Sequence, residues 1–169
     1  MNKETAVHFR KATEGDIDFL SSILISAAAA SGVNIQVAEL SSHPDTYQYV
    51  EGFPTGNDVG VIAETQEGTP VGAAWVRLLP MDAHAIHEPL PELTMGVVPQ
   101  YQRIGIGTQL MEELYKAARG MGIPKISLGV HKDNIPAVQL YKQQNWVEDG
   151  YYLEYMMMSK EIDRDGEKL

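Results

Sequence analysis

The chain has 169 residues, of which 44% are hydrophobic and 21% charged, and this balance suits one globular domain with a full core. It contains no cysteine, which excludes disulfides, zinc–thiolate sites and thiol nucleophiles. The formal net charge of −10 argues against a nucleic-acid-binding surface and gives only a small preference for cationic partners such as amines.

The sequence shows no sign of targeting to a membrane. No apolar signal core follows Met1–Glu4, and no run approaches the roughly 18 apolar residues of a membrane span. We therefore expect a cytoplasmic protein without membrane partners. No repeat, low-complexity segment or linker divides the chain, so residues 1–169 are expected to form a single domain with a frayed, charged tail at 163–169.

Alternating and helical patterns of apolar residues follow one another along the chain. Thr13 and Asp16 have the spacing of a capping box, which predicts a helix start directly after a short first strand. Pro44 suits the first turn of a second helix, and Gly120 ends a later, strongly amphipathic one. The patterns predict strands at 7–11, 61–65, 71–79, 92–98, 126–130, 146–147 and 153–158, and helices at 17–30, 42–52, 109–119 and 136–143.

The segment 97–108 joins a predicted strand to the amphipathic helix and contains two glycines. A helix N-terminus has about four unpaired N–H groups and a positive dipole end, which together attract phosphate. Gly105 and Gly107 would let an anion approach the backbone closely. A dinucleotide fingerprint needs a third glycine where Leu110 stands, and a P-loop needs lysine where Thr108 stands. A pyrophosphate site and a tight turn with packing glycines remain as alternatives.

Several segments together resemble the GNAT (Gcn5-related) N-acetyltransferases. Gln102–Gly107 matches the Gln/Arg-x-x-Gly-x-Gly/Ala motif, and Pro91–Pro99 is similar to the family's fourth strand. Asn134–Tyr141 is similar to the Asn-x-x-Ala-x-x-Leu-Tyr segment, and Phe9–Asp16 resembles the usual opening. One departure is Asn145-Trp146, where the family commonly has glycine and phenylalanine. The turn before Trp146 is therefore expected to differ.

The resemblance implies an α/β (α+β) acyl-CoA N-acyltransferase fold with a mixed, mostly antiparallel sheet that is splayed between strands four and five and flanked by helices. It implies acetyl-CoA as the co-substrate, with pantetheine in the gap, pyrophosphate on the loop, and no metal. Gly129 then marks either close approach of this ligand or simple packing. Arg103 either adds a phosphate contact or is a solvated charge. The implied cofactor-binding residues are Val97, Val98, Gln102, Arg103, Ile104, Gly105, Ile106, Gly107, Thr108, Asn134, Ala137 and Tyr141.

Acyl transfer from a thioester to an amine needs a proton acceptor, an oxyanion donor and a proton donor for the thiolate. By resemblance, Tyr141 is the general acid; the alternative is a core tyrosine with a structural partner. Glu92 is the candidate base; the alternative is a surface carboxylate, with water taking the proton. The amide near Val97 is the expected oxyanion donor. Asn134 is expected to hydrogen-bond the pantetheine arm, to cap its helix, or both.

We therefore predict transfer of acetyl from acetyl-CoA to a primary amine by direct attack in a ternary complex. The expected acceptor is a small molecule; a protein or peptide acceptor and a non-catalytic acyl-CoA sensor are the alternatives, and a homodimer is left open. His84, His87 and Glu88 lack the spacing of metal ligands and are expected to be solvated or to line the substrate site. Acceptor specificity should come from the segment between the first two helices, the 80–91 loop and a hairpin around 150–152.

Overall fold

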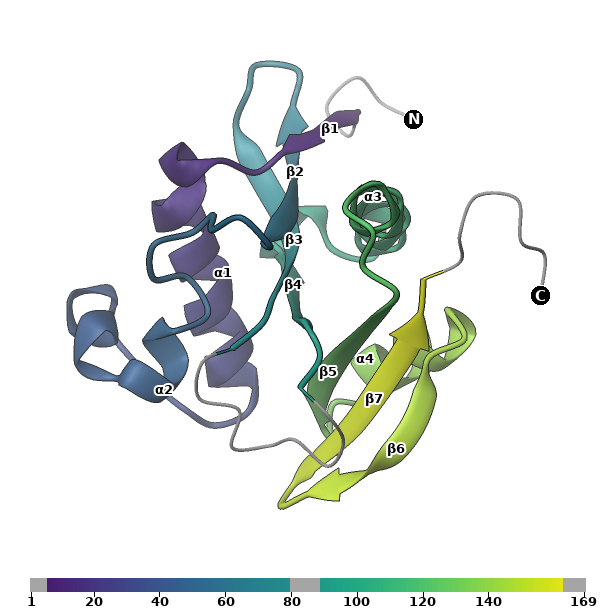
Figure 1. Ribbon diagram of the computed structural model, residues 1–169. Helices are drawn as coiled ribbons and strands as arrows, with labels where there is room; N and C mark the ends of the chain where they lie inside the picture. The colour runs from purple at the N-terminus through teal and green to yellow at the C-terminus, as the bar shows by residue number, and fades with distance from the viewer. Residues whose placement is uncertain (1–5, 80–88, 163–169) are drawn as a thin grey trace.

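The computed structural model describes residues 6–79 and 89–162, and within these ranges the strands form one seven-stranded sheet with helices on both faces (Figure 1). The strands are β1 (Val7–Lys11), β2 (Val59–Thr65), β3 (Pro70–Arg77), β4 (Glu92–Val97), β5 (Lys125–His131), β6 (Val147–Tyr152) and β7 (Tyr155–Glu161). The helices are η2 (Glu14–Asp16), α1 (Ile17–Ala30), η3 (Val37–Ser42), α2 (Pro44–Tyr47), η4 (Pro99–Tyr101), α3 (Ile106–Gly120) and α4 (Ile135–Gln143).

The sheet has the order β1-β2-β3-β4-β5-β7-β6, and each neighbouring pair except β4 and β5 is antiparallel. The exception is parallel, and within the part of the chain that the structure describes its register consists of Glu92 opposite Ser127. The Ser127 N–H donates to the Pro91 carbonyl at 2.9 Å, after which the two strands diverge. The predicted mixed, mostly antiparallel sheet, open between strands four and five, is confirmed.

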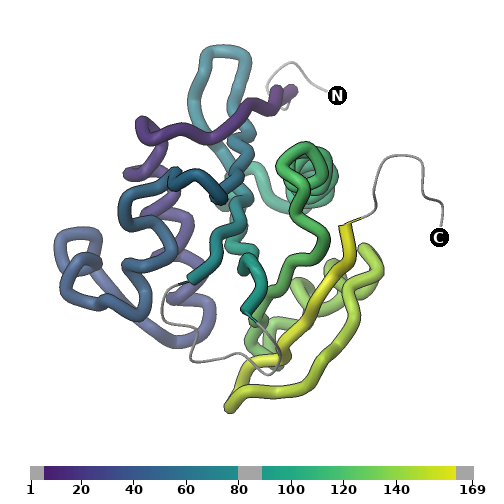
Figure 2. The backbone as a smooth tube through the Cα atoms, in the orientation of Figure 1, coloured from purple at the N-terminus to yellow at the C-terminus, as the bar shows by residue number. Residues whose placement is uncertain are grey.

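Two apolar cores lie on opposite faces of the sheet. α1 covers one face and α3 the other, on either side of β2–β4 (Figure 2). The α3 core includes the fully buried Leu110 and Leu114, and the α1 core includes Leu20 and Trp75. Gly96 of β4 lets α1 approach closely, because a Cβ there would lie only 2.9 Å from Ile23 Cγ2. α1 therefore packs directly against the strand that opens away from β5.

The second helix is shorter than predicted. α1 spans the predicted 17–30, and the Asp16 carboxylate accepts the Thr13 N–H at 2.8 Å, whereas α2 ends at Tyr47 instead of near residue 52. The reason is tertiary: the carbonyls of residues 48, 49 and 51 accept hydrogen bonds from the side chains of Trp75 and Arg77. These contacts fix a turn where the sequence pattern favoured a helix.

The last hairpin turns later than expected. Gly150, with φ 141°, lies inside β6 at a register shift, and the turn follows at Leu153, whose φ is 51°. A glycine favours bulges as well as turns, so its presence alone could not locate the reversal.

Asn145 has φ 63°, a left-handed conformation that glycine adopts without strain, and Trp146 is buried behind it.

None of the helices in the described ranges is both long and apolar enough to cross a membrane.

Candidate active site

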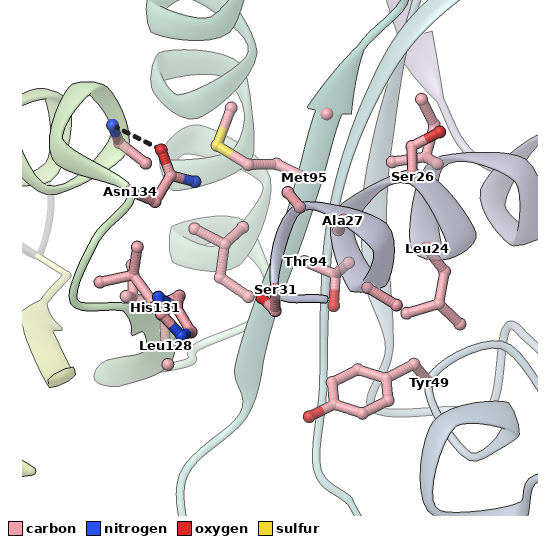
Figure 3. A pocket seen from close by; sticks show the side chains of 18 of the residues that line it. Leu24, Ser26, Ala27, Ser31, Tyr49, Thr94, Met95, Leu128, His131 and Asn134 are labelled. Carbon is pink, nitrogen blue, oxygen red and sulfur yellow. Dashed lines mark hydrogen bonds between the residues drawn. The ribbon is translucent and has the colours of Figure 1, made fainter. Parts of the chain in front are cut away.

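A cavity of about 570 Å³ lies where β4 and β5 separate, and α1 and α2 supply its other walls (Figure 3). Its apolar lining comes from α1 and from both strands. Hydroxyl groups of α1 line it as well, and its other charged and hydrogen-bonding side chains come from α2, the turn after it, β4, the segment after β4, β5, α4 with its cap residue, and β7. The cavity is therefore built by segments that are far apart in the sequence and that meet only because the sheet is open at this point.

The direction of the β4 amides follows from its pairing with β3. The Val98 N–H donates to the Val71 carbonyl at 2.8 Å, and amides in an antiparallel strand alternate in direction. The amides of Met95 and Val97 therefore point away from β3, toward the side from which β5 has diverged. Two backbone donors thus face the gap, one of them the Val97 amide that was predicted to be the oxyanion donor.

Glu92 lies at the closed end of the gap, on the α1 face of the sheet. The Tyr49 hydroxyl donates to Glu92 Oε2 at 3.0 Å, which joins β4 to the turn after α2. A Cβ on Gly129 would lie 3.8 Å from Glu92 Oε1, so the carboxylate passes over this glycine of β5. The carboxylate is half-buried and lines the cavity.

Two buried side chains of β3 hold the backbone around Tyr49. Trp75 Nε1 donates to the Tyr49 carbonyl at 2.9 Å, and Arg77 Nη1 donates to the carbonyls of Gln48 and Glu51 at 2.9 and 2.8 Å. Arg77 is neutralised by Asp58 at 2.8 Å, and both of these side chains are almost completely buried. Tyr49 therefore reaches Glu92 from a segment that is anchored at several points.

Tyr141 lines the cavity from α4, and its ring packs against Trp146 with centroids 5.8 Å apart. Burial raises the pKa of Tyr141 to about 12, so the hydroxyl is protonated at neutral pH. Tyr141 is partly buried, and within 6–79 and 89–162 its hydroxyl has no hydrogen-bond partner, which leaves it able to donate to a ligand in the cavity.

Asn134 precedes α4 and accepts the Ala137 N–H on its Oδ1 at 3.4 Å (Figure 3). The helix-cap interpretation of Asn134 is therefore confirmed. Its amide nitrogen is turned toward the cavity, which both residues line. A single side chain can thus cap the helix with its oxygen and still offer a donor to a ligand.

The glycine loop, residues 103–108, directly follows the lining residue Gln102 and does not itself line the cavity. Gln102 Nε2 donates to the Val97 carbonyl at 2.8 Å and ties the loop to the end of β4, while Arg103 and Gly105 have φ values of 65° and 91°. The Gln109 N–H donates to the Gly105 carbonyl at 3.2 Å, so the amides of residues 106–108 precede the first intrahelical bond. The loop therefore presents a run of unpaired backbone donors.

The predicted site residues divide into two groups. The structure brings seven of them to the cavity: Glu92, Val97, Val98, Gln102, Asn134, Ala137 and Tyr141. It does not bring Arg103, Ile104, Gly105, Ile106, Gly107 and Thr108 there. The side chain of Ile106 belongs to the core and is only 3% exposed, so only its main chain could meet a ligand.

Sequence reasoning missed Tyr49, Thr94 and His131, which also line the cavity. The His131 ring accepts the Asp133 N–H on Nδ1 at 3.2 Å and meets the Tyr155 ring edge-on at 5.6 Å. Strand alternation could have indicated two of the three, because Thr94 shares the face of residue 92 and His131 that of residue 129. Tyr49 had no such signal.

Several predictions fall outside the described residues, namely those on His84, His87, Glu88 and the tail 163–169. Across residues 6–79 and 89–162 the structure contains no group of three His, Asp or Glu side chains arranged to hold a metal ion.

Comparison with known proteins identifies related folds. The phosphinothricin acetyltransferase of Sinorhizobium meliloti, solved with AcCoA, has TM-score 0.66 and 17% identity over 96% of this chain and 92% of its own. The PaiA N-acetyltransferase of Thermoplasma acidophilum, solved with coenzyme A, has TM-score 0.67 and 17% identity over 92% of this chain and 99% of its own. A putative acetyltransferase of Acinetobacter baylyi ADP1 has TM-score 0.70 and 15% identity over 97% of each chain. At these identities the likeness is one of fold.

No curated protein matches the sequence. The sequence model of the acetyltransferase (GNAT) family, however, matches residues 33–146, which is more than half of the chain. The matched region contains β4, the glycine loop, β5 and α4, which together form the open part of the sheet. The chain belongs to the acetyltransferase (GNAT) family.

Proposed function

We propose that this protein transfers an acetyl group from acetyl-CoA to the primary amine of a small molecule, by direct attack in a ternary complex. The observation that carries this proposal is the gap between β4 and β5, with the Tyr141 hydroxyl on one side and the Glu92 carboxylate at its closed end. Membership of the family supports the reaction, and similar folds solved with AcCoA or coenzyme A support the donor.

The donor is proposed to extend from the gap to the glycine loop. The free amides of Met95 and Val97 suit the amide-rich pantetheine arm, which would also meet Val98, Gln102, Asn134 and Ala137. The amides of residues 106–108, which precede the first intrahelical bond, suit the pyrophosphate, and the remaining amides of the 103–108 loop and the guanidinium of Arg103 are proposed to lie near it. Backbone donors dominate this site, so a protein with a net charge of −10 can bind an anionic ligand.

The thioester supplies the acetyl group, and three groups of this chain act on the reaction. Glu92 takes the proton of the attacking amine as the new C–N bond forms, and the Val97 amide stabilises the oxyanion. Tyr141 donates a hydrogen bond to the sulfur as the C–S bond breaks. A pKa of about 12 makes full proton transfer to a thiolate unfavourable, so Tyr141 acts as a hydrogen-bond donor and solvent completes protonation.

The proposed acceptor is a small molecule because α1 and α2 wall a cavity of about 570 Å³, and this volume has to hold the acceptor beside the pantetheine arm. Two similar folds are phosphinothricin acetyltransferases, one of them putative, and their names also suggest a small-molecule acceptor.

The test is the release of coenzyme A thiol from acetyl-CoA with a panel of small amines. Release only with peptides or lysine side chains would indicate a protein acetyltransferase. Binding of acetyl-CoA without turnover would indicate a sensor.

The role of Glu92 makes a separate prediction. Glu92→Gln removes the proton acceptor, so kcat/KM should fall by about 10²-fold or more, and the acidic limb of the pH–rate profile should disappear. Glu67→Gln, in the turn between β2 and β3, is the control and should leave both unchanged. A Glu92→Gln enzyme with the pH–rate profile of the wild type would contradict the role of base.

A further inference from the structure

We infer that the acceptor is a cationic amine without an anionic group, and that it is held by the Thr94 hydroxyl and the Tyr49–Glu92 pair. This inference rests on the proposed function and names its substrate class. A zwitterionic amino acid, or a substrate bearing a phosphinate or phosphate, would be a poor acceptor. The inference depends on the charges that line the cavity and on one buried hydroxyl.

The charged side chains that line the cavity are acidic. Glu92 lines the closed end of the cavity and Asp45 its α2 rim, and among the described residues that line it there is no Lys or Arg. Residues 80–88, whose sequence is Pro-Met-Asp-Ala-His-Ala-Ile-His-Glu, contain none either. An ammonium group entering the cavity would meet carboxylates, whereas an anionic group would be desolvated beside like charges, without a Lys or Arg partner among the described lining residues.

Among the described residues that line the cavity, His131 is the one side chain of a basic type. Its Nδ1 accepts the Asp133 N–H at 3.2 Å, and the Asp133 carboxylate lies 3.9 Å from the same nitrogen. Because Nδ1 accepts this N–H, His131 presents an N–H donor on Nε2 to a ligand. The Asp133 carboxylate beside the ring disfavours the approach of an anionic group.

Thr94 places a hydroxyl group in the wall of the cavity, independently of the charges. Its side chain is only 8% exposed, and across 6–79 and 89–162 its hydroxyl has no hydrogen-bond partner. Figure 3 shows the Thr94 hydroxyl turned into the cavity, toward the Tyr49 ring. A buried hydroxyl without a partner is rare in proteins and indicates a ligand group. The attacking amine has N–H bonds to donate, and Thr94 Oγ1 can accept one while Glu92 takes the proton.

Matched acceptor pairs that differ by one carboxylate test the inference: tyramine with tyrosine, and putrescine with ornithine. Each is titrated calorimetrically into the protein saturated with coenzyme A, and thiol release from acetyl-CoA is measured in parallel. The amine without carboxylate should bind at least about 30-fold more tightly than its partner. Equal or tighter binding of the amino acids, or no binding by either member of both pairs, would overturn the inference.

The two readouts separate this inference from the proposed function. Preferential binding of the decarboxylated amine without any thiol release would contradict acetyl transfer and still support the substrate class. Thiol release with both members of a pair, at equal affinity, would support acetyl transfer and overturn the substrate class.

Variants of the lining residues add a structural check. Thr94→Val should weaken amine binding about fivefold without lowering the free energy of unfolding, because the hydroxyl it removes has no partner. Asp45→Lys should reduce the preference for the amine over the amino acid by about fivefold, whereas the control Glu67→Lys makes the same charge change outside the cavity and should not. Unchanged affinity in Thr94→Val together with an unchanged preference in Asp45→Lys would overturn the inference.

Discussion

At the scale of single residues, Tyr141 and Tyr115 are chemically alike and differ in their partners. The Tyr115 hydroxyl accepts Trp146 Nε1–H at 2.9 Å, whereas no such bond is made by the Tyr141 hydroxyl to any described residue. Burial raises the pKa of both phenols. The sequence could not distinguish a core tyrosine from a donor at either position. The hydrogen bonds in the structure distinguish the two tyrosines, and they assign Tyr115 to the core.

Tyr141→Phe should lower kcat by about 10²-fold and leave the free energy of unfolding within about 0.5 kcal/mol of the wild type. The hydroxyl contributes to the reaction and to no internal hydrogen bond. Because its pKa is about 12, kcat of the wild type should not fall between pH 8 and about pH 10 through loss of this proton. Steady-state kinetics and urea unfolding measure the two effects.

Tyr115→Phe is the matched control. It leaves the buried Trp146 N–H without its acceptor, so it should cost about 1–2 kcal/mol of stability and leave kcat unchanged. Full activity of Tyr141→Phe, or a large loss of its stability, would return Tyr141 to the role of a core residue.

At the scale of elements, Arg77 of β3, which donates hydrogen bonds to the turn after α2, is itself held in place by one buried ion pair. Arg77 Nη2 donates to Asp58 Oδ2, and the same carboxylate accepts the Thr55 N–H at 2.7 Å. Asp58→Asn leaves Arg77 buried without its counter-charge and should cost about 3 kcal/mol. Because Arg77 also holds the backbone beside Tyr49, the KM for the amine should rise more than the KM for acetyl-CoA. Urea unfolding and two-substrate kinetics test this.

The exposed ion pair between Lys132 and Glu154 is the control for that prediction. Glu154→Gln removes a pair in the same chain, but water solvates both partners, so stability should not change measurably. If Asp58→Asn left the free energy of unfolding and the KM for the amine unchanged, as expected for Glu154→Gln, the buried pair would not be needed to hold Arg77 and the turn in place.

Elements whose signals are local could be predicted from the sequence, and elements shaped by distant contacts could not. α1 begins and ends as predicted because its capping carboxylate and its apolar spacing lie within one segment. α2 is cut short by side chains of β3, and the last hairpin turns at Leu153 rather than at Gly150. The candidate site divides in the same way. The β4, loop and α4 motifs are local, whereas the contact of Tyr49 with Glu92 spans 43 residues.

At the scale of the whole molecule, acid affects stability in two opposing ways. The net charge of −10 is self-repulsive, so protonating exposed carboxylates should relieve repulsion. The ion pairs of Arg10, at the junction of β1, β2 and η2, have the opposite effect, because protonating their carboxylates removes a stabilising interaction. Its guanidinium donates to both oxygens of Asp16 at 2.8 and 2.9 Å and to Glu64 at 2.9 Å. These hydrogen bonds hold the pKa of each carboxyl below its usual value.

The sign of the effect follows from linkage. A carboxyl whose pKa is lower in the folded than in the unfolded state stabilises the fold fully above its unfolded pKa, near 4, and loses this contribution as the pH falls through its folded pKa. Unfolding near pH 4 should therefore take up protons. Arg10→Gln removes the largest cause of both shifts, so it should reduce this uptake near pH 4 by at most about one proton, roughly half a proton for each carboxyl. Urea unfolding from pH 7 to pH 3 gives the uptake as the slope of stability against pH.

Lys11→Gln is a suitable comparison because it removes one positive charge from the same strand. If only the overall charge mattered, the two variants would show the same slope as each other. If the network at the junction controls the response, Lys11→Gln should keep the wild-type slope, and Arg10→Gln alone should be less sensitive to acid. Equal slopes in the wild type and Arg10→Gln would mean that the general relief of repulsion outweighs these two carboxylates across this pH range.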